Sequence, residues 1–148
     1  MEIEIRVGSE FLIQFKRLSK KYRSLKSDIK DLKDSLVIDP YQGTSLGKGV
    51  RKVRMAIASK GKGKSGGARV ITYNLYQEGD SIIIDLLTIY DKGEISNISD
   101  EFISFLLDKR ENLIRRIGLF FVLAPDLQQN LTLLPLICDK KVVSLPLI

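Results

Sequence analysis

Residues 51–71 read RKVRMAIASKGKGKSGGARVI, and they carry the clearest secondary-structure signal in the chain. Every second residue from Val53 to Ile57 is apolar, which is the period-two pattern of a half-buried strand. The glycines and lysines of residues 59–67 have no such pattern and are typical of a flexible loop. β-branched residues return after Gly67 and indicate a second strand. The stretch therefore predicts a β-hairpin with a flexible, cationic loop.

The same loop satisfies a relaxed nucleotide-loop pattern, because residues 58–65 read ASKGKGKS. A P-loop binds phosphate because its glycine-rich turn leads into a helix, whose N-terminal amide groups and dipole face the anion. Here Gly66 and Gly67 are followed by ARVITY, which is typical of a strand. We therefore expect no nucleoside triphosphate site in this loop.

Hydrophobic periodicity extends the prediction to the rest of the chain. Strands are expected at residues 3–7, 51–58, 68–76 and 81–90, and helices after Ser9, Ser24 and Ser99. The apolar stripes of the first two helices have matching spacing, so we expect a helical hairpin that ends at Asp39-Pro40, followed by a loop to Gly49. The strand at 81–90 is almost wholly apolar, which predicts an internal position in the sheet.

These elements predict an α+β fold, with a small, mostly antiparallel sheet, an N-terminal helical hairpin and a C-terminal helix. We assign residues 1–118 to this domain. Residues 119–148 contain three prolines and no clean periodicity, and they are treated as a C-terminal extension of unknown structure.

Composition removes several classes of chemistry. The 148 residues include no histidine, which excludes His-dependent triads, histidine acid–base pairs and His-containing zinc sites. Cys138 is the only cysteine, which excludes a disulfide framework and a cysteine metal cluster. Any reaction must use Lys, Arg, Tyr, Asp, Glu or Ser side chains. We expect no metal ion and no small-molecule cofactor.

The first residues, MEIE, lack the basic and apolar regions of a signal peptide. The longest apolar run, residues 119–124, has six residues. A membrane-spanning helix needs about 20. A cytoplasmic location with no membrane partner is therefore expected.

The positive charge is concentrated in one part of the chain. The protein carries 24 Lys and Arg against 18 Asp and Glu, a net charge of +6. Residues 1–98 hold 18 of the basic and 12 of the acidic residues, so the whole surplus lies there. One stretch has eight basic residues and no acidic residue: Lys48, Arg51, Lys52, Arg54, Lys60, Lys62, Lys64 and Arg69. This density favours a polyanionic partner; the alternative is a solubilising edge hairpin.

The expected hairpin places these cations on a common surface. Lys52 and Arg54 are two residues apart on one strand, so their side chains point the same way about 7 Å apart. Arg69 begins the returning strand and is expected near them. The loop adds three lysines that alternate with glycines and can follow an irregular anion: Lys60, Lys62 and Lys64. The hairpin therefore suits a phosphate backbone.

At these residues the chain resembles the RelE/HigB group of toxins from bacterial type II toxin–antitoxin systems, within the RelE/ParE superfamily. RKVRMA at 51–56, KGKGKSGGARVI at 60–71 and LLTIYDK at 86–92 carry the resemblance, which covers about residues 3–107. It implies a small α+β, microbial-RNase-like fold. It also implies an endoribonuclease that cleaves messenger RNA, usually in the ribosomal A site, and that is silenced by a cognate antitoxin protein.

The resemblance assigns catalytic roles to four cations. Lys52 and Arg54 match the family's basic pair on the second strand, and Arg69 matches its central arginine. Lys92 is the best match to its late cation. We expect Arg54 and Arg69 to hold the scissile phosphate, Lys52 to orient or activate the ribose 2′-OH, and the fourth cation to help the leaving group. The family's tyrosine near the C-terminal helix has no counterpart, because residues 95–98 read ISNI.

The expected reaction needs no metal ion. Attack of the 2′-OH on the adjacent phosphate gives a 2′,3′-cyclic phosphate and a 5′-OH, through a phosphorane whose growing negative charge cations stabilise. Five further residues are expected to contact RNA: Arg51, Lys60, Lys62, Lys64 and Tyr90. The expected partners are messenger RNA, the ribosome and the antitoxin. Two other functions stay open: a ParE-type toxin directed at gyrase, and a non-catalytic nucleic-acid-binding module.

Overall fold

The structure is a computed structural model that describes residues 2–77 and 79–123. The described residues form five strands and three α-helices, which confirms the expected α+β class. The chain divides after Ile98 into two units. The first unit contains the whole sheet and two of the helices, and the third helix belongs to the second unit.

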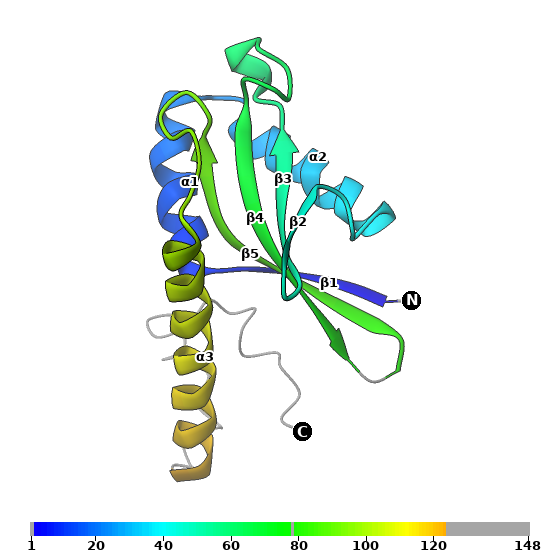
Figure 1. The fold of residues 1–148 in the computed structure, drawn as a ribbon, viewed down its shortest axis with the longest axis vertical. Helices are drawn as coiled ribbons and strands as arrows, with labels where there is room; N and C mark the ends of the chain where they lie inside the picture. Colours follow the sequence, from blue (N-terminus) through cyan, green and yellow to red (C-terminus); the bar gives the residue numbers. More distant parts are fainter. Residues whose placement is uncertain (1, 78, 124–148) are drawn as a thin grey trace. The chain divides into compact units, whose positions relative to one another are not determined.

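The strands form one mixed sheet. Their bounds are Glu2–Val7 (β1), Thr44–Gly47 (β2), Val50–Met55 (β3), Ala68–Gln77 (β4) and Ser81–Asp91 (β5). The order across the sheet is β1-β5-β4-β3-β2 (Figure 1). β1 runs parallel to β5, and the other three neighbouring pairs are antiparallel. The sheet is therefore mostly antiparallel, and the apolar β5 is internal, as predicted.

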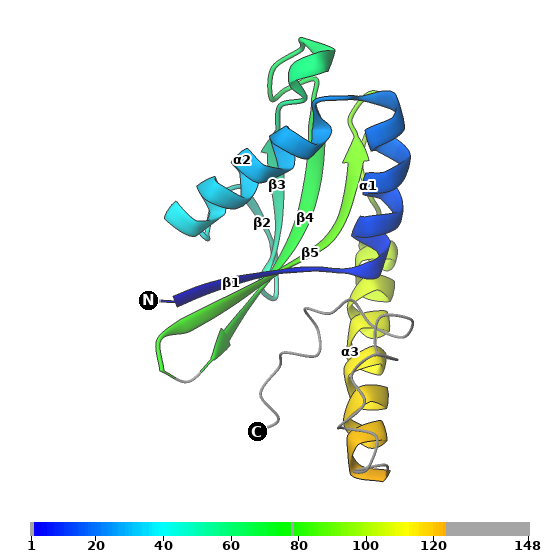
Figure 2. The same cartoon turned by 180° about the vertical axis from the view of Figure 1, so that it is seen from behind.

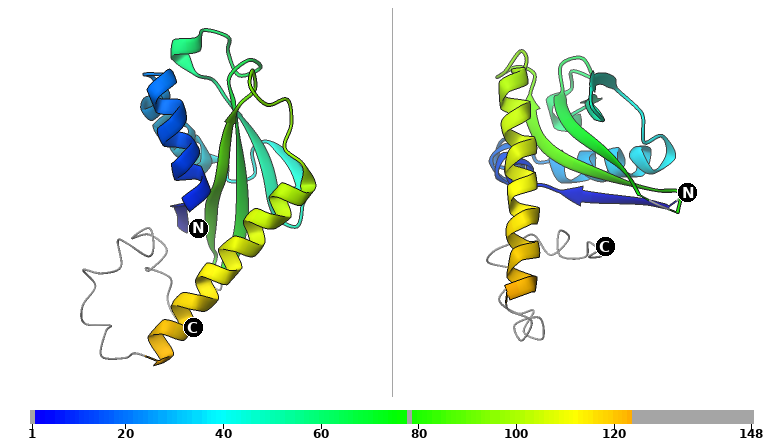
Figure 3. Two further views of the ribbon diagram at one scale, coloured as in Figure 1. Left: turned by 90° about the vertical axis from the view of Figure 1, so that its left-hand side faces the viewer. Right: turned by 60° about the horizontal axis from the view of Figure 1, so that its bottom comes forward.

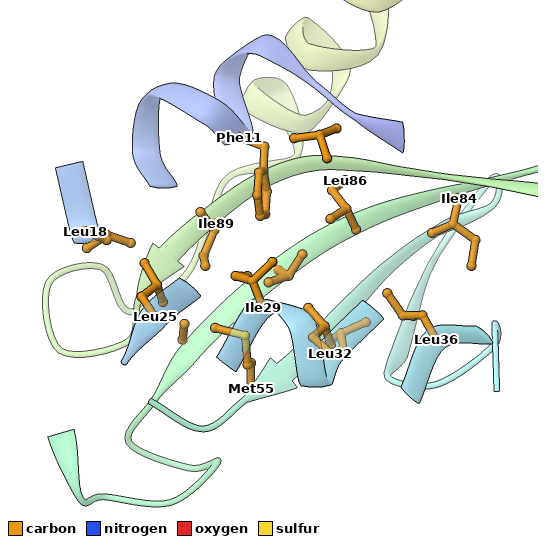
Figure 4. Close-up of a cluster of buried hydrophobic side chains, with 14 of the residues drawn as sticks. Phe11, Leu18, Leu25, Ile29, Leu32, Leu36, Met55, Ile84, Leu86 and Ile89 are labelled. Atoms are coloured by element: carbon orange, nitrogen blue, oxygen red, sulfur yellow. The ribbon is translucent and has the colours of Figure 1, made fainter. Parts of the chain in front are cut away.

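Two helices, α1 (Ser9–Lys21) and α2 (Leu25–Ile38), cover one face of this sheet (Figure 2; Figure 3, left). Their apolar stripes point toward the strands (Figure 4). The core between the two layers includes Phe11, Leu18, Leu25, Ile29, Leu32, Leu36, Met55, Ile84, Leu86 and Ile89. Burial of these side chains holds the helices on the sheet, since apolar burial contributes about 25 cal/mol per Å².

The strand expected at residues 3–7 is confirmed as β1, which enters the sheet beside β5. The two helices that follow it do not form the expected helical hairpin. α1 and α2 are joined at residues 22–24 and diverge from that joint (Figure 2). Each apolar stripe needs an apolar partner, and here both stripes find it on the sheet face instead of on the other helix.

β2 lies where the sequence predicted a loop. It pairs with β3 at the edge of the sheet, with Thr44 opposite Lys52 and Ser45 opposite Arg51. All four residues of β2 are exposed. The strand therefore has no apolar alternation for periodicity to detect.

The expected end of the cationic loop is confirmed. A short 3-10 turn at Ala58–Lys60 opens the loop, and β4 follows its glycines. Residues 68–77 are thus a strand and supply no helix N-terminus for a P-loop.

The second unit contains α3, Asp100–Leu123. Ser99 caps this helix, since the Phe102 N–H donates to Ser99 Oγ at 3.2 Å. α3 continues through Gly118, so the boundary expected there falls inside a helix. Residues 124–148 of the expected extension lie outside the described residues. No described helix combines the length and apolarity that a bilayer span requires.

Candidate functional site

Three side chains form a row across β3, β4 and β5. Arg54 lies opposite Arg69, and Arg69 lies opposite Tyr90. Directly opposed residues of antiparallel strands have Cβ atoms about 5 Å apart and project on the same face. This is the face opposite to the one that α1 and α2 cover, because the neighbouring strand residues belong to the core. Lys52 shares the face with Arg54, so the structure brings the expected basic trio together.

The two arginines have no acidic partner among the described residues. Arg54 is exposed, whereas Arg69 is only 6% exposed. Like charges opposed on paired strands destabilise each other, and a buried cation without a counter-ion carries a desolvation penalty. A bound anion would offset both effects. The pair is therefore suited to a phosphate group.

Part of the Arg69 guanidinium is engaged by the protein. Its Nη1 donates to the carbonyl oxygens of Lys64 at 2.9 Å and Ala68 at 3.1 Å. Its Nη2 donates to the carbonyl oxygen of Ser65 at 3.1 Å. These acceptors are neutral, so the positive charge stays uncompensated. The Nε–H and one Nη2–H have no acceptor in the described part of the chain and can bind a ligand.

Tyr90 is buried in the same row. It is 2% exposed, and its hydroxyl has no hydrogen-bond partner among the described residues. Burial raises the pKa of Tyr90, an effect that the charge of Arg69 opposes. The phenol therefore stays protonated, and its hydroxyl is buried beneath the surface of the row. Its ring has no exposed face on which a base could stack, so the expected contact of Tyr90 with RNA cannot be base stacking on the ring as it lies here.

Lys52 and Lys92 both bind the segment that follows β5. Lys52 Nζ donates to Asn97 Oδ1 at 3.2 Å, and Lys92 Nζ donates to the carbonyl oxygen of Ser96 at 2.6 Å. The Lys92 backbone N–H also donates to the Gly67 carbonyl at 3.0 Å, which fixes the end of β5 against the loop. The two ammonium groups are thus bound by two consecutive residues, Ser96 and Asn97. Sequence reasoning missed these acceptors, because the sequence around them has no motif.

Two cations expected to contact RNA are engaged within the fold. Arg51 donates to the carbonyl oxygens of Gln42 at 3.2 Å and Gly43 at 3.0 Å, and so holds the loop before β2. Lys60 Nζ pairs with Asp91 Oδ1 at 2.5 Å, and the Lys60 side chain is 13% exposed. No sequence motif links Arg51 to residues 42 and 43, or Lys60 to Asp91. The composition of the loop therefore could not indicate these contacts.

Lys62 and Lys64 occupy the exposed part of the loop. Neither makes an ion pair with a described residue. The loop that carries them is attached to the fold at two places. Lys60 fastens it near its start, and the Arg69 guanidinium binds the carbonyl groups near its end.

Asp91 is the acidic residue that sequence reasoning missed. Its side chain is 1% exposed and accepts hydrogen bonds from the Tyr22 hydroxyl, Lys60 Nζ and the Gly93 N–H. Burial by itself would raise the pKa of Asp91, but these hydrogen bonds outweigh burial and hold the pKa at about 2. The carboxylate is therefore charged at neutral pH. The sequence indicated the importance of Asp91 only by placing a charged residue at the end of an apolar strand.

Within residues 2–77 and 79–123, no group of three or more His, Cys, Asp or Glu side chains could hold a metal ion. No protein-family model matches the chain. The site offers guanidinium and ammonium donors on one face of a sheet. Such donors bind oxyanions and stabilise negative charge as it develops.

Proposed function

We propose that the chain is a metal-independent endoribonuclease of the RelE/HigB toxin type. The opposed pair of Arg54 and Arg69, with no carboxylate partner among the described residues, carries the proposal. An RNA phosphate matches both the charge and the planar donors of such a pair. The α+β architecture, with two helices on a mostly antiparallel sheet, is compatible with the microbial-RNase-like arrangement that the resemblance implies.

In the proposed reaction the ribose 2′-oxygen attacks the adjacent phosphorus, and the bond from phosphorus to the 5′-oxygen breaks. The 2′-hydroxyl loses its proton and the 5′-oxygen gains one, so the products are a 2′,3′-cyclic phosphate and a 5′-OH. Arg54 and Arg69 bind the nonbridging oxygens, on which negative charge grows. Each preorganised donor of this kind accelerates a reaction by about 10²–10³.

Lys52 and Lys92 act on the two oxygens that change their bonds. Lys52 orients or activates the 2′-OH, and Lys92 assists the leaving 5′-oxygen. The hydrogen bonds of these lysines to Asn97 and Ser96 support the assignment, because they restrict both ammonium groups before RNA binds. Restriction of this kind lowers the entropy that must be lost in the transition state.

The substrate in this proposal is messenger RNA in the ribosomal A site, in the cytoplasm. The ribosome supplies the bent geometry that in-line attack requires. A cognate antitoxin with an acidic surface silences the enzyme, and its association slows as salt rises, because electrostatic steering is screened. These partners come from the resemblance, and the charge surplus of residues 1–98 supports them.

Controlled expression in a bacterial host, followed by mapping of messenger 5′ ends, tests the proposal. Codon-phased cuts with 5′-OH ends are expected, and the Arg54→Ala protein at equal abundance should leave messages intact. Intact messages with damaged DNA would favour the gyrase-directed alternative. Tight RNA binding without any cleavage would favour the non-catalytic module.

A further inference from the structure

The lysine loop, residues 58–67, joins β3 to β4 at one end of the sheet (Figure 1). Of its three lysines, only Lys62 and Lys64 are exposed and without an ion pair among the described residues. The remainder of the loop is attached to the fold near both of its ends. These attachments hold the backbone from which the two exposed lysine side chains extend.

The first attachment is the ion pair of Lys60 with Asp91. The Tyr22 hydroxyl, at the end of α1, and the Gly93 N–H donate to the same carboxylate. A Cβ atom on Gly93 would lie 3.1 Å from Lys60 Nζ, so the turn after β5 packs tightly on the pair. Lys60 is therefore enclosed by groups from the end of α1 and the end of β5.

Two backbone hydrogen bonds extend this attachment to the start of α2. The Ala58 N–H donates to Asp28 Oδ2 at 3.2 Å, and the Ser59 N–H donates to Ser24 Oγ at 2.8 Å. Ser24 Oγ also donates to Asp28 Oδ2 at 2.8 Å. Residues 58–60 are thus fastened to the helical layer as well as to β5.

The second attachment is the Arg69 guanidinium, which binds the carbonyl oxygens of Lys64 and Ser65. Within the loop, the Gly66 N–H donates to the Lys62 carbonyl at 3.3 Å. The two exposed lysines are therefore presented from a segment whose backbone is held on both sides of them.

We infer that Lys60 and Asp91 are positioning residues, whose ion pair fixes the lysine loop so that Lys62 and Lys64, and not Lys60, contact the phosphate backbone. The inference rests on the RNA binding of the proposed function. A loop that is ordered in advance loses less conformational entropy on binding. Lys60 could reach a phosphate only by leaving its ion pair with the buried Asp91 carboxylate, which would then keep only the longer contact with the exposed Lys21, at 3.7 Å. Loss of the closer partner of a buried carboxylate is unfavourable.

The salt dependence of RNA binding separates positioning from contact. Each phosphate contact with single-stranded RNA contributes about 0.7 to the slope of log affinity against log salt. We expect Lys62→Met and Lys64→Met each to lower the magnitude of that slope by about 0.7. Lys60→Met should leave the slope unchanged and weaken binding by about 10-fold, because the loop must then be ordered on binding.

Matched variants complete the experiment, with a noncleavable single-stranded RNA carrying 2′-O-methyl groups as the probe. Lys60→Arg keeps the ion pair and should restore binding, whereas Asp91→Asn should reproduce the loss caused by Lys60→Met. Lys60→Gln serves in place of Lys60→Met if that protein does not melt cooperatively. Amide hydrogen exchange tests the attachment without RNA: residues 61–67 should exchange faster in Asp91→Asn, while β4 and β5 keep their protection.

A fall of the slope by a full contact in Lys60→Met would overturn the inference, because Lys60 would then bind phosphate itself. Unchanged affinity in both Lys60→Met and Asp91→Asn would also overturn it. If the wild-type protein binds no RNA, the proposed function fails, and the exchange experiment still decides whether the ion pair orders the loop.

Discussion

Arg54 and Arg69 face each other across β3 and β4, but they differ in burial and in hydrogen bonding. The Arg54 side chain is exposed and makes no hydrogen bond to the described residues, whereas the Arg69 side chain is buried and donates to three loop and strand carbonyls. Period-two alternation predicted that both would lie on one face near Lys52. It could not predict the burial of Arg69, because that depends on how the loop folds back over the strand.

The difference separates the two arginines in an alanine test. We expect Arg54→Ala to lower the cleavage rate about 100-fold, with a midpoint of thermal unfolding that does not fall, because the repulsion from Arg69 is removed. Arg69→Ala should lower the rate at least as much and also lower the free energy of unfolding by about 2 kcal/mol, because carbonyl groups lose their donor. Single-turnover cleavage of ribosome-bound message and thermal melts measure both effects. Lys26→Ala, an exposed site on α2, is the control, and full activity in Arg69→Ala would refute the mechanism.

Asp91 predicts how stability depends on pH. Its pKa is about 2 in the folded protein, below the ordinary value of 3.8 that it has in the unfolded chain, so folding stabilises its carboxylate. A lowered pKa adds stability that is fully present above about pH 4 and is lost as the pH falls toward 2, in total about 2 kcal/mol. Urea unfolding at pH 7 and at intervals below pH 4 measures this loss.

The matched variants for this measurement are Asp91→Asn and Asp31→Asn. Asp91→Asn should lower the stability at pH 7 and remove this part of the acid dependence. Asp31 lies on the exposed face of α2, so Asp31→Asn should follow the wild-type curve. Equal acid dependence in wild type and Asp91→Asn would show that the hydrogen-bonded carboxylate contributes no linkage.

At the scale of elements, periodicity located α1, α2, β3, β4 and β5 within a few residues, because each buries one stripe or one face. It missed β2, whose residues are all exposed. It also could not predict which strands pair with each other or which surface each helix packs against. The parallel pairing of β1 with β5 and the divergence of α1 from α2 are set by packing on a shared sheet face. No local pattern in the sequence records that choice.

The β3–β4 hairpin depends on a close approach of two backbones at Gly67. A Cβ atom there would lie 2.1 Å from the carbonyl oxygen of Met55, so Gly67→Ala must displace backbone. We expect a loss of about 3 kcal/mol in the free energy of unfolding. At Gly61 a Cβ would meet nothing within 4 Å, but φ is +70°. Gly61→Ala should therefore cost about 1 kcal/mol, because alanine is strained in the left-handed conformation. Urea denaturation compares the two, and equal small losses would contradict the close approach.

At the scale of the whole molecule, the charge and the candidate site belong to the same unit. Every residue of the row and of the lysine loop lies between residues 51 and 92, and the net charge of +6 lies entirely within residues 1–98. Residues 124–148 hold two basic and two acidic residues, so they add nothing to the charge. The composition shift after Gly118 predicted a domain boundary there, but α3 continues past Gly118 to Leu123.

This division predicts the behaviour of a shortened chain that ends at Leu123, the last residue of α3. The shortened chain keeps the whole sheet, both helices that cover it and every candidate site residue. We expect the shortened chain to unfold in one cooperative thermal transition. Its phosphate contacts and net charge are unchanged, so it should bind single-stranded RNA with the same salt slope as the full chain. It should also cleave ribosome-bound message at a rate within about 2-fold of the full chain's rate. A second chain that ends at Gly118 cuts the last turn of α3 and serves as the comparison. Loss of the cooperative transition in the chain ending at Leu123 would mean that residues 124–148 are needed for folding, and an altered salt slope in a folded protein would mean that they contact the nucleic acid.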